Sequence, residues 1–178
     1  MKIFFTTIVL LFLSFNISAQ EWEVYKNESL QIRANFPDTP EKTVQKVDTA
    51  VGTLDMHMVM YAPESGDDNA VYSIIRSDYP EEQFKDADDE YNSNVLDGAV
   101  NGAVSNVQGT LIFDKKVNFN GFPSRNIKIE MSGGYIYINA ILVYNSMYIT
   151  QVICLQENDN NPSIKRFQDS FDIIEVNN

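Results

Sequence analysis

The run Tyr135–Leu155, YIYINAILVYNSMYITQVICL, carries the strongest structural signal in the chain. It contains two segments, Tyr135–Tyr144 and Met147–Leu155, in which apolar residues occupy both alternating positions of a strand. Strands of this kind are covered on both faces of a sheet. We therefore expect the two segments to be central strands, joined by a short turn at Asn145-Ser146.

Strand-like segments extend outward from this pair in both directions. Leu111–Phe119 and Phe122–Met131 precede it and are separated by Asn120-Gly121, a strong two-residue hairpin signal. Apolar and polar residues also alternate through four earlier segments, which end at turn residues such as Pro37, Val51-Gly52 and Pro80. These four segments are Leu30–Phe36, Thr43–Thr49, Leu54–Tyr61 and Val71–Tyr79.

A first helix is predicted after the strand that stops at Pro80. Glu81-Glu82 suits the positive end of a helix dipole, and apolar residues recur at helical spacing through Phe84–Ala103. Gly98 and Gly102 fall within this segment. We expect these two glycines to let the helix backbone approach the sheet closely.

A second helix is predicted at the end of the chain. Asn161-Pro162 is typical of a helix start, and Ile164, Phe167 and Phe171 follow on one stripe. This stripe is expected to dock on the two central strands. Because strands dominate and two helices remain to cover them, the predicted fold class is α+β, a large antiparallel β-sheet with helices packed on its faces.

The first 19 residues have the pattern of a secretory signal peptide. Lys2 is followed by the apolar run Ile3–Phe15, and Ile17-Ser18-Ala19 places a small residue before the cleavage point. The apolar run is shorter than the roughly 20 residues that span a bilayer, which argues against a membrane anchor. We therefore predict a signal peptide over 1–19, one domain over 20–178, and a secreted or periplasmic location.

Composition excludes several classes of function. The chain has 25 acidic and 13 basic residues, a net charge of −12, which argues against nucleic acid as a partner. With His57 as its one histidine, it cannot form a Ser-His-Asp triad or a multi-histidine metal site within one chain. Its one cysteine, Cys154, lies in an apolar run and is expected to be buried. We predict no catalytic residues and no cofactor.

Acidic loops are the best candidates for ligand chemistry. Asp67 and Asp68 lie in a polar loop, and Glu157 and Asp159 precede the last helix. Oxygen-rich loops can bind Ca²⁺, but none of these segments has the EF-hand pattern. A carboxylate pair could also serve a hydrolase. The simpler interpretation is a solvated acidic surface that keeps the protein soluble.

Two side-chain patterns on strands admit both a ligand and a packing role. Met56, Met58 and Met60 alternate on one face of a strand and could bind copper, although a place in the core is the simpler interpretation. Tyr135 and Tyr137 share a strand face and could form an aromatic ligand platform or pack in the interior.

The order of these elements resembles the PsbP-like superfamily, which shares its fold with the Ran-binding Mog proteins. The resembling stretches are Leu30–Pro40, Asp78-Tyr79-Pro80 followed by a long helix, Phe119–Pro123 with Arg125, and Arg166–Phe171. The resemblance implies an α/β/α sandwich around an antiparallel sheet. It also implies an accessory or binding role, since members of the superfamily are mostly non-catalytic.

The expected function is therefore that of an exported, non-catalytic accessory domain that binds a protein or a small ligand in the cell envelope. Two alternatives remain open from the sequence. One is an extracytoplasmic hydrolase that uses a pair of carboxylates, and the other is a binder of divalent cations.

Overall fold

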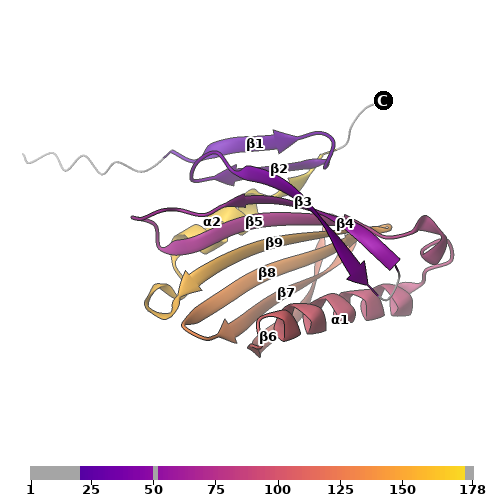
Figure 1. Ribbon diagram of the computed structural model, residues 1–178. Coiled ribbons are helices and arrows are strands. Elements are labelled where there is room, and N and C mark those ends of the chain that lie inside the picture. Colours follow the sequence, from indigo (N-terminus) through magenta and orange to yellow (C-terminus); the bar gives the residue numbers. More distant parts are fainter. Residues whose placement is uncertain (1–20, 50–51, 175–178) are drawn as a thin grey trace, which may run out of the picture.

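The computed structural model describes residues 21–49 and 52–174. The predicted signal peptide and Val51 of one predicted turn lie outside the described residues. Most of the chain forms a seven-stranded antiparallel sheet in the order β3-β4-β5-β9-β8-β7-β6 (Figure 1). These strands are β3 (Glu41–Thr49), β4 (Gly52–Tyr61), β5 (Asn69–Asp78), β6 (Thr110–Phe119), β7 (Phe122–Met131), β8 (Gly134–Val143) and β9 (Ser146–Leu155).

The predicted central pair is confirmed as β8 and β9, which lie inside the sheet and pair antiparallel along their whole length. The turn between them differs by one residue from the expectation. Val143 pairs with Ser146, so the loop residues are Tyr144 and Asn145. Tyr144 has a φ of 53°, a left-handed conformation that the two-residue hairpin requires.

The first helix begins later than predicted. A short 3₁₀ turn forms at Glu81–Gln83, and the helix α1 spans Asp89–Asn106. The physical reason is the N-cap, because the Asp88 carboxylate accepts a 2.8 Å hydrogen bond from the backbone N–H of Tyr91. Phe84, expected inside the helix, instead packs its ring between those of Tyr79 and Tyr91.

Helix α1 covers β7 and β8 on one face of the sheet. Its buried residues Leu96 and Val100 pack on a layer of apolar side chains that comes mostly from those two strands. The buried Arg125 of β7 fixes the helix in place, since its guanidinium pairs with Asp97 of α1 at 2.5 Å and with Asp114 of β6 at 2.7 Å.

The expectation for Gly98 and Gly102 is wrong. Both residues are exposed, and a Cβ atom built on either would meet no other atom within 4 Å. The helix approaches the sheet through Leu96 and Val100, so the two glycines lie on its solvent side.

The closing helix α2 (Pro162–Ser170) docks on the opposite face, as predicted. Ile164, Phe167 and Phe171 are all buried there. The docking surface is wider than expected, because α2 contacts β2 and β5 as well as β9, while Tyr137 and Ile141 of β8 belong to the same buried cluster. The Phe167 ring centroid lies 5.0 Å from that of Phe36 in β2 and 5.4 Å from that of Tyr72 in β5.

A small sheet completes the layer that holds α2. It has the order β1-β2-β10 and consists of β1 (Glu23–Asn27), β2 (Ile32–Phe36) and β10 (Asp172–Ile173). The predicted segment Leu30–Phe36 supplies β2, whereas β1 and β10 were not predicted. Figure 1 shows this small sheet and α1 on opposite sides of the main sheet.

The predicted fold class is confirmed at this level, an α+β fold made of a large antiparallel sheet with a helix on each face. Among the described residues, no helix combines the length and apolar character that crossing a membrane requires.

Candidate functional site

The four acidic candidates occupy different environments. Asp67 is half-buried in the loop before β5, and Asp68 beside it is exposed. Glu157 is exposed on a short 3₁₀ turn after β9, whereas Asp159 bends back onto the sheet. Within residues 21–49 and 52–174, no three His, Cys, Asp or Glu side chains gather closely enough to hold a metal ion.

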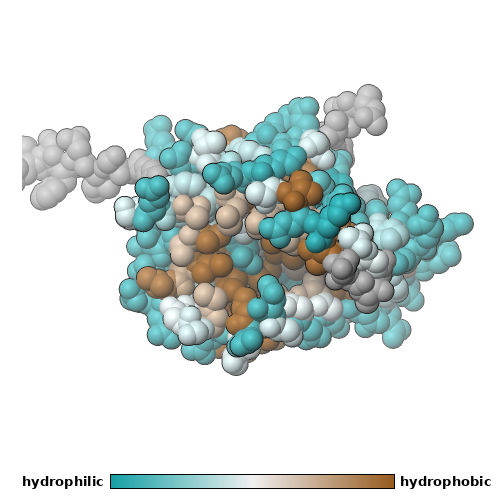
Figure 2. All heavy atoms as spheres, in the orientation of Figure 1, coloured by the Kyte–Doolittle hydropathy of each residue, from teal (hydrophilic) through white to brown (hydrophobic). Residues whose placement is uncertain are grey.

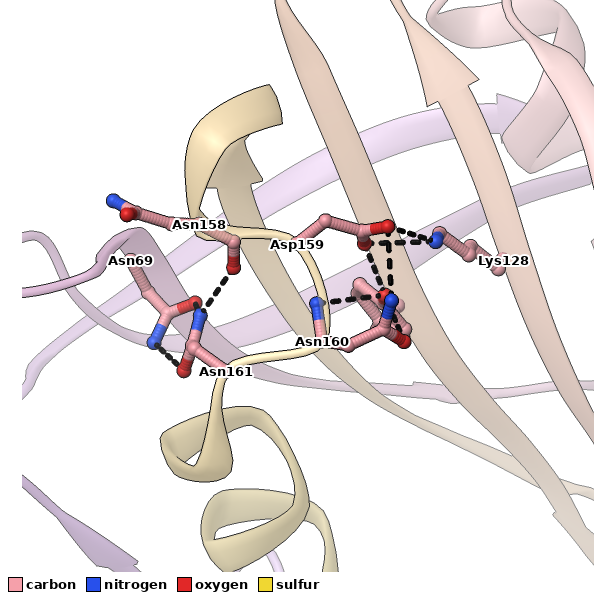
Figure 3. A network of polar contacts seen from close by, with 7 residues as sticks. Asn69, Lys128, Asn158, Asp159, Asn160 and Asn161 are labelled. Carbon is pink, nitrogen blue, oxygen red and sulfur yellow. Dashed lines mark hydrogen bonds and ion pairs between the residues drawn. The ribbon is translucent and has the colours of Figure 1, made fainter.

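Asp159 is bound to the sheet by two side chains (Figure 3). The Lys128 ammonium of β7 donates to its carboxylate at 2.8 Å, and the Tyr137 hydroxyl of β8 donates to the other oxygen. The Lys128 Nζ atom also lies 4.1 Å from the ring centroid of Tyr135 and 5.0 Å from that of Tyr137. The two tyrosines therefore pack against a lysine of the same chain.

The pKa values of this cluster follow from its geometry. Burial alone would raise the pKa of Asp159, but the hydrogen bonds from Lys128 and Tyr137 outweigh burial and lower it. Burial alone would lower the pKa of Lys128, but its bonds to Asp159 and Tyr137 raise it. Both groups are held in their charged forms, so a cation at Asp159 would have to displace Lys128.

A second polar network fixes the start of α2 (Figure 3). Asn69 and Asn161 exchange two side-chain hydrogen bonds, of 3.1 and 2.8 Å. Asn161 also caps α2 by accepting from the N–H of Ser163 at 3.1 Å. Asp67 accepts from the Tyr72 hydroxyl at 2.7 Å. This network uses its polar groups to hold two loops together, which is a structural task.

Cys154 is buried, as predicted, with 1% of its surface exposed. Burial raises the pKa of its thiol, and the negative charge of nearby Asp159 raises it further. The thiol is therefore protonated at neutral pH and inert as a nucleophile.

A group of half-buried apolar side chains lies on the α1 side of the main sheet, next to the strands on which α1 mainly packs. Strand alternation and pairing place seven apolar side chains of β4, β5 and β9 on this face, and all seven are half-buried. We call this surface the open face, and Figure 2 shows hydrophobic residues gathered in this part of the molecule. Its residues are Met56, Met58, Met60, Val71, Ile75, Ile149 and Ile153.

The open face corrects the expectation that the three methionines of β4 form part of the core. They point to the same side of the sheet as α1, but α1 packs mainly on β7 and β8, away from β4. On the opposite side of the same strand, Val59 is fully buried in the layer beneath α2.

The width of the open face matches one helix. Neighbouring strands are about 4.8 Å apart, so the three uncovered strands span about 10 Å, close to the diameter of a helix. Asp97 and Ser93 of α1 reach toward β7 and β6. The half-buried Ala99 and Ala103 therefore lie on the other flank of α1, which borders the open face with small side chains.

Negative charge lies at one end of the open face. The chain passes from the end of β5 to the first turn of α1 through residues 79–90, and the stretch 86–90 carries four exposed carboxylates. They belong to Asp86, Asp88, Asp89 and Glu90. A cationic group next to an apolar ligand surface would find a complementary field here.

Comparison with known proteins gives a structural likeness and no sequence relationship. No protein-family model matches the chain, and no curated protein matches its sequence. The solution structure of the cyanobacterial PsbP, CyanoP, from Synechocystis sp. PCC 6803 superimposes with a TM-score of 0.55 at 12% identity. The match covers 89% of this chain and 95% of CyanoP. The fold is PsbP-like.

A second solved structure is more distant. It is a Pseudomonas aeruginosa protein of unknown function, PA94, with a TM-score of 0.44 and 12% identity over 82% of this chain and 92% of that one. At 12% identity, the likeness to CyanoP shows the fold alone. Function therefore has to be argued from the surface of this chain.

Proposed function

We propose that the protein is an exported, non-catalytic accessory domain that binds an amphipathic helix of a partner protein on its open face. The observation that carries this proposal is the set of seven half-buried apolar side chains on β4, β5 and β9. Apolar side chains gathered on one face, here interrupted by Ser73, Ser77 and Gln151, typically mark an interaction site. Three methionines suit the task, because their flexible side chains adapt to different partners.

The charge at the end of the open face defines the partner further. An apolar helix that lies beside α1 and carries lysine or arginine at the end near Asp86–Glu90 would pair with four exposed carboxylates. The partner is therefore a cationic amphipathic helix, bound with its apolar side on the sheet.

Export and the non-catalytic role rest on other observations. Export is supported by the signal-peptide pattern of residues 1–19, and intact mass of the recovered protein should place its N-terminus at Gln20 or Glu21. The non-catalytic role is supported by the occupation of Asp159 and Asp67, whose carboxylates bind Lys128 and Tyr72.

A titration with designed peptides tests the proposed function. The first peptide is a helix as long as α1 (18 residues), with leucines on one side and lysines on the other. The second keeps the leucines and replaces the lysines by glutamates. We expect the lysine peptide to bind more tightly, and added salt to reduce that difference.

Two substitutions distinguish the open face from the rest of the surface. Ile75→Lys places a charge in the middle of the open face, while Val44→Lys changes an exposed residue (51%) on the opposite side of β3. Ile75→Lys should weaken binding of the lysine peptide at least tenfold, and Val44→Lys should leave it within twofold. Equal affinity of both variants and the wild type would refute the proposal.

A further inference from the structure

A second concave surface lies on the other side of the main sheet, in the layer that contains α2. It is an open cavity on the surface, of about 550 Å³, between α2 and strands β6, β7 and β8, and its volume is in the usual range of small-molecule sites. Phe113 and Val117 of β6 and Ile164 of α2 form apolar walls. The polar part of the lining consists mostly of side-chain amides.

A row of polar residues forms the floor of this cavity and continues under α2. Asn126, Asn139 and Thr150 are direct cross-strand partners on β7, β8 and β9. Asn126 Nδ2 donates to Asn139 Oδ1 at 2.6 Å. Thr150 is fully buried, and its Oγ1 atom has no hydrogen-bond partner among the described residues. Buried polar atoms normally have hydrogen-bond partners, so a Thr150 Oγ1 that lacks one within residues 21–49 and 52–174 marks this row as a polar site that could accept a ligand.

Gln168 of α2 supplies a further amide to the cavity lining. Its Nε2 atom is buried and has no hydrogen-bond partner within the described part of the chain. A buried donor without a partner costs free energy. A hydrogen-bond acceptor that reached Gln168 Nε2 from the cavity would give this donor a partner without breaking an existing hydrogen bond of the described residues.

The two charged side chains that line the cavity, Lys165 and Asp169, pair with each other, whereas the ammonium of Lys115 on the rim packs 4.9 Å from the ring centroid of Phe113. Lys165 Nζ lies 2.5 Å from Asp169 on α2, and Lys128 pairs with Asp159 beyond Tyr137. A charged ligand would therefore find no unpaired countercharge among the lining residues. A neutral ligand that both donates and accepts hydrogen bonds matches amides, which also do both.

From these features we infer that the cavity beside α2 binds a neutral, polyhydroxylated small molecule of the sugar class. Its hydroxyl groups would bond to Asn126, Asn139 and Gln168, and its C–H surface would lie against the wall formed by Phe113 and Val117. This site is independent of the open face, because the two lie on opposite sides of the sheet. Failure of either proposal leaves the other intact.

The test follows the side-chain NH₂ resonances of the full mature protein by ¹H–¹⁵N NMR. The probes are glucose, N-acetylglucosamine and maltose, with glucuronate as the charged analogue. We expect at least one neutral sugar to shift the NH₂ signals of Asn126, Asn139 and Gln168 along a saturating curve, and glucuronate to bind more weakly.

Three variants assign the binding to this cavity. Gln168→Met keeps the size of the side chain and should weaken binding roughly three- to tenfold. Val117→Trp changes a residue that is 45% exposed, so it should fold normally while filling the cavity and abolishing binding. Gln151→Met, a half-buried glutamine on the opposite face, should have no effect.

The inference is overturned if none of the three neutral sugars gives a saturating shift at those amides. It is also overturned if a sugar binds with equal affinity to Val117→Trp and the wild type, or if glucuronate binds as tightly as the neutral sugars.

Discussion

Asp159 shows how a single side chain chosen for ligand chemistry can hold the fold together instead. Its carboxylate accepts hydrogen bonds from Lys128 and Tyr137, so it joins the segment before α2 to strands β7 and β8. The sequence identified the residue by its acidic neighbours. It could not identify its partner, because Lys128 is 31 positions away and meets Asp159 only in the folded sheet.

Asp159→Asn should lower the unfolding free energy by about 1.5–3 kcal/mol at neutral pH, the usual worth of a hydrogen bond to a charged group. Because the pKa of Asp159 is lowered in the folded state, its contribution is present above about pH 4 and is lost as the pH falls through the folded pKa. The difference between wild type and variant should therefore shrink in acid. Chemical denaturation between neutral and acidic pH measures this difference.

The control for this substitution is Asp68→Asn, in an exposed loop position, which should change stability by less than about 0.5 kcal/mol. On the alkaline side, Lys128 keeps its contribution below about pH 10 and loses it as the pH rises through its raised pKa. A difference between Asp159→Asn and wild type that stays constant from neutral pH into acid would contradict the assigned ion pair.

Glycine gives a second residue-scale prediction. Gly98→Ala and Gly102→Ala should each stabilise the protein by up to about 1 kcal/mol, because alanine favours a helix and its Cβ meets open space at both positions. Gly134→Ala is the contrasting variant, since its Cβ would lie 2.1 Å from the backbone oxygen of Cys154 and should destabilise strongly. Thermal denaturation of the three variants measures these changes in stability. A loss of stability in both helix variants would show that Gly98 and Gly102 do not lie on the solvent side of α1.

At the scale of elements, α2 is the piece of structure that closes one side of the core. Phe167 is fully buried and Phe171 is 4% exposed, and their rings contact aromatic residues of the main and small sheets. Phe167→Ala and Phe171→Ala should each cost about 3–5 kcal/mol. Val24→Ala, at a position that is 66% exposed, should cost less than about 0.5 kcal/mol. Denaturation midpoints near wild type in both Phe variants would mean that α2 is not docked.

Most elements could be predicted because their signals are local. Alternating apolar residues, the Asn120-Gly121 turn and the Asn161-Pro162 cap each act within a few positions, and all three correspond to observed features. The elements and boundaries that the sequence did not predict also have physical causes. Strand β1 is largely exposed and lacks clear alternation, and β10 has two residues. Helix α1 starts after Asp88 because the Asp88 side chain caps it by accepting a hydrogen bond from the N–H of Tyr91, whereas Pro80 makes no side-chain cap.

At the scale of the whole molecule, the main sheet is covered unevenly. One face is closed by α2 and a small sheet, while on the other α1 packs mainly on β7 and β8, and the open-face residues of β4, β5 and β9 are half-buried. Strand periodicity could predict that Met56, Met58 and Met60 share a face. It could not predict that this face stays open, because coverage depends on where α1 lies rather than on the strand itself.

Methionine methyl NMR tests the role of the open face most directly. The mature chain would contain five methionines, three of them on the open face and Met131 near the end of β7, which α1 covers. With ¹³C-methyl methionine and the leucine–lysine peptide, the signals of Met56, Met58 and Met60 should shift together and saturate, while Met131 stays in place. Saturable binding that leaves the three methyl signals unmoved, or that shifts Met131 instead, would contradict the account.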